Sequence, residues 1–407
     1  MIHAGIDGDP IDAELGALVD RETRRRAETL QLVAGETIAS PAVRRILATS
    51  LSDTYAEGYP GARYQGGCEV VDEIEELAIA RATKLFGAEY VNVQPVSGTA
   101  AASAVYAAFA QPGDPVLSLR LDHGGHQTHG SRANFSGRWF NPIRYSVSES
   151  DELIDYDQIR DLALLHRPRL LIAGSAMYSR LIDFPALRAI ADEADCILWV
   201  DAAYLGGLVA GGSAPNPVPY ADVVTLVTHK VLRGPRGGVL LGAGVHGPAL
   251  QKAVFPFTQG APAMNVIAAK AAAFAEAASG EFAVHVGAVV ANARALCAAL
   301  TERGLRIVSG GTDTNLAVVD VSASGLSGVE AQRRLHEAGI VVDKAVLPFD
   351  PRPATEGSAI RIGTPIATLA GGDVDTMGQI AEWMVEALSD PAEHARIRAS
   401  IAELLAG

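Results

Sequence analysis

Apolar and polar positions alternate along this chain with two different periods, and the changes between them mark the predicted elements. Short apolar runs such as 170–173 and 197–200 predict buried strands, and residues 185–194 between them have the spacing of an amphipathic helix. Strand, helix and strand in this order form a crossover unit that leaves the two strands parallel. We therefore expect an α/β fold with a mostly parallel sheet.

The same pattern predicts how the chain is divided. Helices are expected over residues 11–32 and 41–49, and a long alanine-rich helix over 265–303. After it, short strands (305–308, 316–319, 340–342 and 360–362) alternate with helices (328–337, 373–388 and 391–405). We expect an N-terminal helical arm (1–50), a large α/β domain (51–275) and a small C-terminal α+β domain (276–407).

Length and charge limit the classes of function. With 407 residues, 49% of them hydrophobic, the chain can form one large and one smaller domain. Its net charge of −14 argues against binding to nucleic-acid phosphates or to an anionic membrane surface. A small anionic ligand would therefore need a local basic pocket.

The sequence carries no visible signal for secretion, membrane insertion or disulfide formation. The N-terminus lacks the basic segment and apolar core of a signal peptide, and no run of 18 apolar residues without charge occurs. Cys68, Cys196 and Cys297 are widely spaced, so neither a disulfide framework nor a zinc site is indicated. We expect a cytoplasmic protein that binds no nucleic acid, membrane or metal.

Lys230 is the central chemical feature of the chain. It follows the apolar run 222–227 and precedes a Gly- and Pro-rich turn over 234–238. Desolvation at the end of a buried strand, together with cationic neighbours, lowers the pKa of a lysine and makes it nucleophilic towards carbonyl groups. Two interpretations remain open at this point: a Schiff-base lysine, or a lysine that extends past the strand end into solvent.

Two further candidates lie at predicted strand ends. Ser97, Gly98 and Thr99 follow the strand 90–93 and precede an alanine-rich helix, an arrangement that offers backbone N–H groups to a phosphate. The same residues could equally serve as a plain helix cap. Asp201 ends the strand 197–200, where open α/β sheets place ligand-facing groups, or it caps the segment that follows.

Two glycine-rich loops carry clusters of polar side chains. The segment HGGHQTHGS lacks the HExxH geometry of a zinc helix, so we favour an imidazole stacked on a flat cofactor over a metal site. The segment 55–67 contains four glycines and three tyrosines and makes a poor helix and a poor strand. It is expected to be an ordered loop that has a function, forms a subunit contact, or does both.

These motifs together resemble serine hydroxymethyltransferase, a fold-type I pyridoxal-phosphate enzyme, over nearly the whole chain. The shared stretches, in family order, are YAEGYPGARYQGG, CEVVDEIEELAIARATKLFGAEYVNVQPVSG, HGGHQTHGS, PNPVPYADVV with THK, RGPRGG, FPFTQGAP and SAIRIGTP. The resemblance implies a seven-stranded sheet in the large domain, pyridoxal 5'-phosphate as cofactor and a small amino acid as substrate. It also implies a homodimer, or a tetramer of dimers, with active sites shared across the interface.

The resemblance also assigns residues to the cofactor. Lys230 would form the Schiff base, Asp201 would keep the pyridine nitrogen protonated, and His126 would stack on the ring. The other cofactor contacts that it implies are Ser97, Gly98 and Thr99 at the phosphate, Ser175 and His229 around the ring, and Tyr55 and Gly260 from the neighbouring subunit.

The substrate positions of the family are only partly kept. Arg361 would bind the substrate α-carboxylate through its planar guanidinium, and Glu57 would be the acid/base near the substrate hydroxyl. Tyr64 matches the first of the family's paired tyrosines. Gln65 replaces the second, which is part of the catalytic constellation, and Tyr204 replaces a histidine.

Further departures accompany these two. Gly35 replaces a serine that helps to bind the substrate carboxylate, and Leu226 and Val227 replace threonines before the lysine. Gln127 and Ala345 replace a leucine and an asparagine that line the folate slot. The cofactor positions are therefore kept while substrate and folate positions change together, which indicates an altered substrate or an altered one-carbon or aldehyde partner.

The leading hypothesis is a hydroxymethyl transferase that makes or breaks the Cα–Cβ bond of a small amino acid, of the serine/glycine or α-methylserine type. Two alternatives remain open: a folate-independent aldolase or transaldolase that acts on threonine-like substrates, and an impaired paralogue that binds pyridoxal phosphate without turnover. The resemblance implies tetrahydrofolate as a second cofactor, but Gln127 and Ala345 predict that it binds weakly or in a shifted pose.

Overall fold

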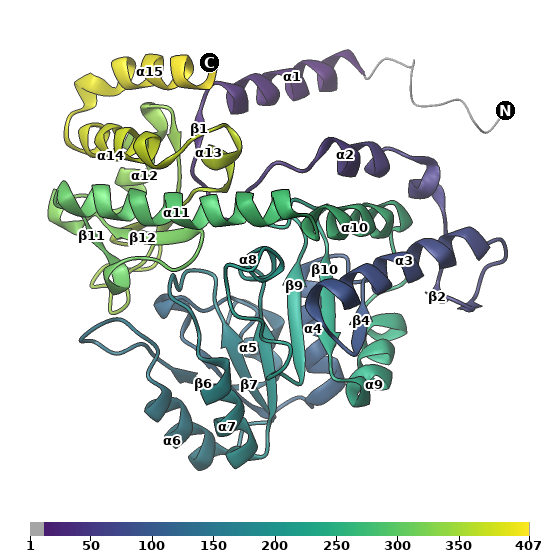
Figure 1. Ribbon diagram of the computed structural model, residues 1–407. Helices are drawn as coiled ribbons and strands as arrows, with labels where there is room; N and C mark the ends of the chain where they lie inside the picture. The colour runs from purple at the N-terminus through teal and green to yellow at the C-terminus, as the bar shows by residue number, and fades with distance from the viewer. Residues whose placement is uncertain (1–11, 407) are drawn as a thin grey trace.

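The computed structural model describes residues 12–406, with a large domain below and a smaller one above in the view of Figure 1. The large domain is built on a seven-stranded sheet with strand order β4-β10-β9-β8-β7-β5-β6. Its strands are β4 (Tyr90–Asn92), β5 (Pro115–Leu119), β6 (Asn141–Tyr145), β7 (Leu170–Gly174), β8 (Ile197–Asp201), β9 (Val223–Val227) and β10 (Gly238–Gly242). Only β10 pairs antiparallel with its neighbours, so the expected mostly parallel sheet is confirmed.

Helices cover both faces of this sheet. In β7, Leu170 and Ile172 face a core shared with α4 (Gly98–Phe109) and α9 (Gly247–Lys252), whereas Leu171 faces the opposite core. Successive side chains of a strand point to opposite faces of the sheet. Because both faces of β7 are buried, every residue of this strand is apolar. The other helices of the domain are α3 (Glu69–Phe86), α5 (Phe135–Trp139), α6 (Tyr156–His166), α7 (Phe184–Ala194), α8 (Gly206–Ala210) and α10 (Met264–Ala277).

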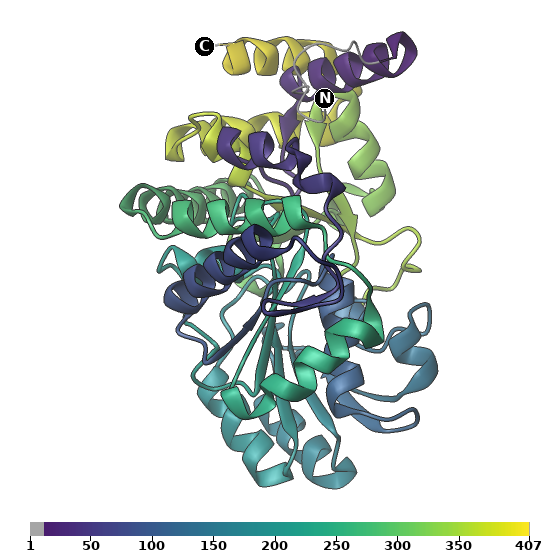
Figure 2. The same cartoon turned by 90° about the vertical axis from the view of Figure 1, so that its right-hand side faces the viewer.

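The small domain is built on a four-stranded sheet with strand order β11-β12-β15-β14. Its elements are α11 (Gly280–Glu302), β11 (Arg306–Ile307), β12 (Leu316–Asp320), α12 (Gly328–Glu337), β13 (Ile340–Val341), β14 (Asp343–Ala345), β15 (Ala359–Gly363), α13 (Pro365–Leu369), α14 (Val374–Ser389) and α15 (His394–Ala406). Figure 2 shows this domain stacked on the large one, with α1 (Ala13–Ala27) and α15 at its far end.

The expected helix over residues 11–32 is wrong after residue 27, and residue 11 lies outside the described residues. Helix α1 ends at Ala27, and the next residues form the short strand β1 (Leu30–Gln31), which pairs parallel with β13. Leu30 and Leu32 are buried in the small-domain core. Tertiary burial therefore overrides the local helical spacing. The remaining N-terminal elements are α2 (Pro41–Leu47), β2 (Gly58–Tyr59) and β3 (Ala62–Arg63).

The expected long helix over residues 265–303 is also wrong, because it is two helices. Helix α10 ends at Ala277, and Ser279 caps α11 by accepting a hydrogen bond from the Phe282 N–H at 3.2 Å. By length and composition α11 could cross a membrane. Its apolar residues are used inside the fold, however, since Val286 and Leu296 are buried and the helix packs against α14 and α13.

Candidate active site

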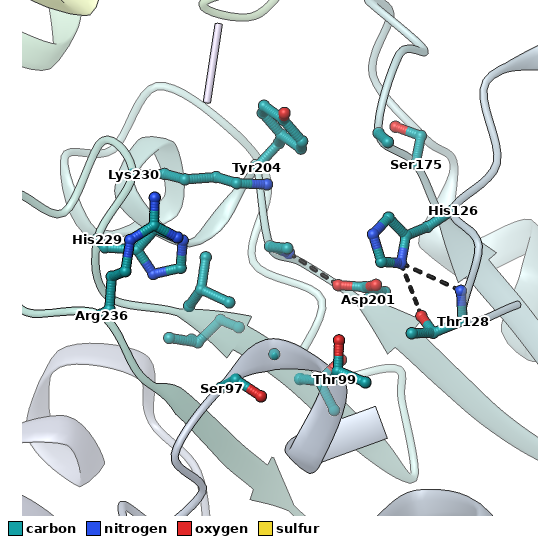
Figure 3. Close-up of a pocket in the computed structure, with 16 residues that line it drawn as sticks. Ser97, Thr99, His126, Thr128, Ser175, Asp201, Tyr204, His229, Lys230 and Arg236 are labelled. Carbon is teal, nitrogen blue, oxygen red and sulfur yellow. Dashed lines mark hydrogen bonds between the residues drawn. The ribbon is translucent and has the colours of Figure 1, made fainter. Parts of the chain in front are cut away.

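A cavity of about 270 Å³ opens at the carboxyl ends of β7, β8 and β9, beside the N-terminus of α4. Parallel strands bring their carboxyl-end residues to one edge of a sheet, which is where α/β proteins bind ligands. Nine of the residues that the sequence singled out line this cavity: Ser97, Gly98, Thr99, His126, Ser175, Asp201, Tyr204, His229 and Lys230. Figure 3 shows the side chains of the other eight, without Gly98, converging from separate strands and loops.

Lys230 lies in the turn between β9 and β10, and its side chain ends in the cavity (Figure 3). Burial lowers the pKa of Lys230 to about 7; Asp201 acts in the opposite direction, and Arg361 and Arg236 add to the lowering. The Nζ atom lies 3.1 Å from the centroid of the Tyr204 ring. Near neutral pH a large share of this amine is therefore unprotonated and able to attack a carbonyl group.

Asp201 ends β8 and is hydrogen-bonded to His129. In the sequence, His129 was visible only as one histidine of the segment HGGHQTHGS. His129 Nε2 lies 2.9 Å from Asp201 Oδ2, and the backbone N–H of His126 donates to His129 Nδ1 at 3.3 Å. Because Nδ1 accepts, the proton of the neutral ring belongs on Nε2, which donates to Asp201. Burial raises the pKa of Asp201, but the His129 hydrogen bond and nearby positive charges outweigh it and keep that pKa below its usual value.

His126 forms part of the cavity wall close to this pair. Donor atoms of His126, His129 and Asp201 lie within 4.8 Å of one another, a spacing that a metal ion could bridge. His126 Nδ1 already lies 2.7 Å from Thr128 Oγ1, however, and the other two residues bond each other. Burial lowers the pKa of His126 to about 4, so the ring is neutral at physiological pH. A flat neutral imidazole suits packing on a planar cofactor ring.

The N-terminus of α4 provides an anion site. Ser97 caps the helix by accepting a hydrogen bond from the Ala100 N–H at 3.0 Å. The N–H groups of Gly98 and Thr99 belong to the first turn, which has no intrahelical acceptors, and they lie beside the cavity. A Cβ atom at Gly98 would lie 2.8 Å from Val227 Cγ1, so glycine is needed for the helix to start this close to β9.

His229 and Arg236 add two more nitrogen-bearing side chains to the cavity (Figure 3). Within the described part of the chain, His229 Nδ1 is buried and has no hydrogen-bond partner, which marks a position for a ligand atom. Arg236 was not predicted as a site residue, because the sequence of a turn does not show in which direction its side chains point. The helix terminus, the orphaned imidazole nitrogen and the guanidinium fit a phosphate group, and Lys230, Asp201 and His126 fit the ring of pyridoxal phosphate.

Comparisons with known proteins identify the family of this chain. The family model of serine hydroxymethyltransferase matches residues 9–384. The serine hydroxymethyltransferase of Koribacter versatilis is 46% identical over 396 residues, which are 97% of this chain and 93% of that protein. The chain belongs to the serine hydroxymethyltransferase family. It is a PLP-dependent transferase of fold type I, as the sequence motifs predicted.

Within this serine hydroxymethyltransferase-family site, Arg361 lies beside the cavity, with its Cζ atom 5.5 Å from the Tyr204 ring centroid. Its Nη1 donates to the Ala176 carbonyl at 2.7 Å. Asp343, directly opposite on β14, accepts from Nη2 at 2.6 Å and from Nε at 3.1 Å. Asp343 therefore occupies one edge of the guanidinium, and an incoming carboxylate would meet the remaining edge. The sequence missed this pair because strand register is invisible in it.

Two departures from the family motifs lie next to each other. A Cβ atom at Gly35 would lie 3.2 Å from the Tyr204 hydroxyl oxygen and 4.0 Å from Lys230 Cε. The phenol of Tyr204 therefore fills the space that a side chain at position 35 would need. The replacement of serine by Gly35 and the replacement of histidine by the longer Tyr204 are therefore sterically linked.

The residues expected around Glu57 do not line the cavity of their own chain. Gln65 Nε2 donates to Glu57 Oε2 at 3.0 Å, and the Glu57 N–H donates to Gln65 Oε1 at 2.7 Å. A Cβ atom at Gly260 would lie 3.7 Å from Glu57 Oε1, so these residues gather at one place. Tyr55 and Tyr64 are 61% and 76% exposed.

The remaining departures divide between the cavity and other parts of the fold. Leu226 and Val227 line the cavity. Gln127 is exposed, and Ala345 is buried in a small apolar cluster with Val308 and other residues of the small domain. Neither Gln127 nor Ala345 lines the cavity within the described residues.

Proposed function

We propose that this chain catalyses reversible hydroxymethyl transfer at Cα of a small amino acid, of the serine/glycine or α-methylserine type. The observation that carries the proposal is the Lys230 amine, with a pKa of about 7, in a cavity that also contains the Asp201 carboxylate. Pyridoxal phosphate supplies an electron sink for the charge left on Cα when the Cα–Cβ bond breaks. The protein's own residues hold that group, orient the substrate and manage its protons.

On the cofactor side, each residue has one task. Lys230 would hold the cofactor covalently, and Asp201 would keep the pyridine nitrogen protonated, because an adjacent anion favours the charged ring. His129 keeps Asp201 ionised by donating to it at 2.9 Å. His126 would pack on the face of the cofactor ring. The turn Ser97–Thr99 would bind the phosphate. Ser175 and His229 complete the contacts.

On the substrate side, Arg361 would bind the α-carboxylate through the guanidinium edge that Asp343 leaves free. Two parallel N–H donors match the two oxygens of a carboxylate in distance and direction. Tyr204, whose ring lies close to both Lys230 Nζ and the Arg361 guanidinium, would border the bound amino acid. This arrangement would fix the substrate so that the bond to be broken projects over the cofactor ring.

We further propose that the active unit is a homodimer in which Glu57 serves the cavity of the partner copy. Glu57 would accept the proton of the substrate β-hydroxyl as the Cα–Cβ bond breaks and return it in the reverse direction. The exposure of Tyr55, Tyr64 and Phe257, at 61%, 76% and 75%, supports an interface here. Exposed aromatic side chains concentrated near one loop are typical of protein contacts.

A turnover screen tests the reaction. Purified protein should carry the visible absorption of lysine-bound pyridoxal phosphate, and Lys230→Ala should lose it, whereas the exposed Lys252→Ala should keep it. Glycine, serine, threonine and α-methylserine are then compared with and without tetrahydrofolate, both for spectral change and for release of aldehyde. Spectral silence with all four amino acids would contradict the proposal and favour a protein that binds cofactor without turnover. Cleavage of threonine alone would favour the aldolase.

A mixing experiment tests the shared site. Lys230→Ala and Glu57→Gln proteins should each be inactive, but refolding them together should recover about a quarter of the activity. Random pairing makes half of the dimers mixed, and in each two-fold symmetric mixed dimer one of the two shared sites has both residues intact, which gives about a quarter of all sites. No recovery, with pairing shown by size and by differential tags, would mean that Glu57 serves its own chain.

A further inference from the structure

Lys270 is a buried lysine to which the reaction above gives no task, and burial lowers its pKa to about 7. It lies on α10 and is 1% exposed. Its Nζ atom lies 2.6 Å from the Val93 carbonyl oxygen, 3.1 Å from that of Pro95 and 2.8 Å from that of Gly238. Three acceptors match the three N–H donors of an ammonium group. Burial of a polar amine is costly unless its N–H groups are hydrogen-bonded, so this complete set of acceptors indicates a defined task.

The three carbonyls belong to the two segments that form the cavity wall. Val93 and Pro95 lead from β4 into the turn that begins α4, and Gly238 begins β10 directly after the loop that carries Lys230. The two segments also touch through their backbones, since the Gly238 N–H donates to the Pro95 carbonyl at 2.9 Å. A Cβ atom at Gly238 would lie 2.3 Å from the Ser97 carbonyl oxygen. Lys270 therefore joins the phosphate turn to the lysine loop.

Gln259 holds the same turn from another side. Its Nε2 donates to the Gln94 carbonyl at 3.0 Å, and its Oε1 accepts from the Val96 N–H at 3.2 Å. Peptide groups between Val93 and Val96 are thus bound alternately by Lys270 and by Gln259. A segment held at each successive peptide cannot shift without breaking several hydrogen bonds, so the turn that follows it has a fixed direction.

We propose that Lys270 is a positioning residue that aims the N–H groups of the turn Ser97–Thr99 at the cofactor phosphate. The inference rests on the phosphate site of the proposed function, and Lys270 acts through the turn without touching the cofactor. The lysine loop packs tightly on this side chain, because a Cβ atom at Gly237 would lie 2.4 Å from Lys270 Cε.

The test compares two ligands of the cofactor-free protein: pyridoxal phosphate, and pyridoxal, which lacks the phosphate but has the same aldehyde and ring. Lys270→Met preserves length and removes the donors. Its dissociation constant for pyridoxal phosphate should rise about tenfold or more, the change that corresponds to one misaligned charge-assisted contact. Its dissociation constant for pyridoxal should stay nearly unchanged. Lys252→Met, an exposed lysine-to-methionine change on α9, is the matched control and should alter neither.

Each outcome decides the matter. Equal weakening of both ligands by Lys270→Met would show a general role in folding and overturn the proposal, as would no weakening of either. Thermal unfolding of the cofactor-free proteins shows whether Lys270→Met folds; if it does not, Gln259→Leu must produce the same phosphate-selective loss, or the proposal falls. If the unaltered protein binds the two ligands equally tightly, the phosphate site itself is misassigned, which is a failure of the proposed function.

Discussion

The side-chain amide of Gln65 bonds Glu57 at both ends: Gln65 Oε1 accepts from the Glu57 N–H at 2.7 Å, and Gln65 Nε2 donates to Glu57 Oε2 at 3.0 Å. One side chain therefore fixes both the backbone and the carboxylate of the proposed proton acceptor. In the family motif this position carries a tyrosine, whose single hydroxyl could not make both contacts. The glutamine at this position therefore fixes the orientation of the Glu57 side chain.

Gln65→Leu should therefore lower kcat roughly ten- to hundredfold and leave KM for the amino acid nearly unchanged. A carboxylate that loses its hydrogen-bond partner forfeits about 1–3 kcal/mol, here from the orientation needed in the transition state. Gln379→Leu is a matched control, because Gln379 also donates to a glutamate, Glu382, at 3.3 Å on an exposed helix. An unchanged kcat in Gln65→Leu would show that Glu57 does not need the hydrogen bonds from Gln65.

Gly35 and Tyr204 should behave as a coupled pair. Gly35→Ser adds atoms within 3.2 Å of the Tyr204 hydroxyl and should push that phenol out of place, weakening amino-acid binding about tenfold. In a Tyr204→Phe background the clash is absent, so the same change should do little or improve binding. Spectral titration with glycine gives the four dissociation constants of the cycle. Purely additive effects would show that the two positions are independent, since contacting residues typically couple by about 0.5–3 kcal/mol.

Reconstitution of the cofactor-free protein with pyridoxal phosphate should accelerate as the pH rises through about 7, the pKa of Lys230. Only the neutral amine attacks the aldehyde, and a lysine with the ordinary pKa of 10.5 would be almost entirely protonated there. Arg236→Met should move the midpoint to higher pH, because the Arg236 charge contributes to the lowering. The exposed Arg132→Met is the control. A midpoint near 10.5 in the unaltered protein would contradict the burial argument.

Much of this site could be predicted because its members lie at strand ends. Lys230, Asp201 and Ser97 each follow an apolar run, and parallel strands bring such positions to one edge. Residues whose role depends on a direction or a register were missed. His129 was visible as one histidine of a motif, but only the fold places its Nε2 against Asp201.

The fold was predictable to a similar degree, and for the same reason. Apolar runs located β4, β7, β8 and β9, most of whose residues are buried. They did not locate β6, where only Tyr145 is buried. The apolar pattern failed at β1, where two residues join a distant strand and local spacing carries no information about that partner. It also failed at Ser279, since an alanine-rich run hides a helix break that depends on one capping hydroxyl.

Tetrahydrofolate is expected to bind weakly or in a shifted pose. Ala345 has no side-chain donor or acceptor and is buried among apolar residues, and Gln127 is exposed where the family has leucine. One missing hydrogen bond to a polar ring edge costs about 1–3 kcal/mol, or roughly ten- to a hundredfold in affinity. Glu57 is retained and would serve folate in the family, but a base for the β-hydroxyl is needed without folate as well. Its presence therefore does not decide the question.

Calorimetry with glycine bound measures this affinity directly. Gln127→Leu should strengthen tetrahydrofolate binding, because it restores an apolar contact at an exposed position that tolerates the change. Gln111→Leu, another exposed glutamine, should leave the affinity unchanged. Tight stoichiometric binding to the unaltered protein, or turnover that strictly requires tetrahydrofolate, would mean that other residues compensate for Gln127 and Ala345. In that case the altered positions would define a different way of holding the pterin and would carry no information about folate dependence.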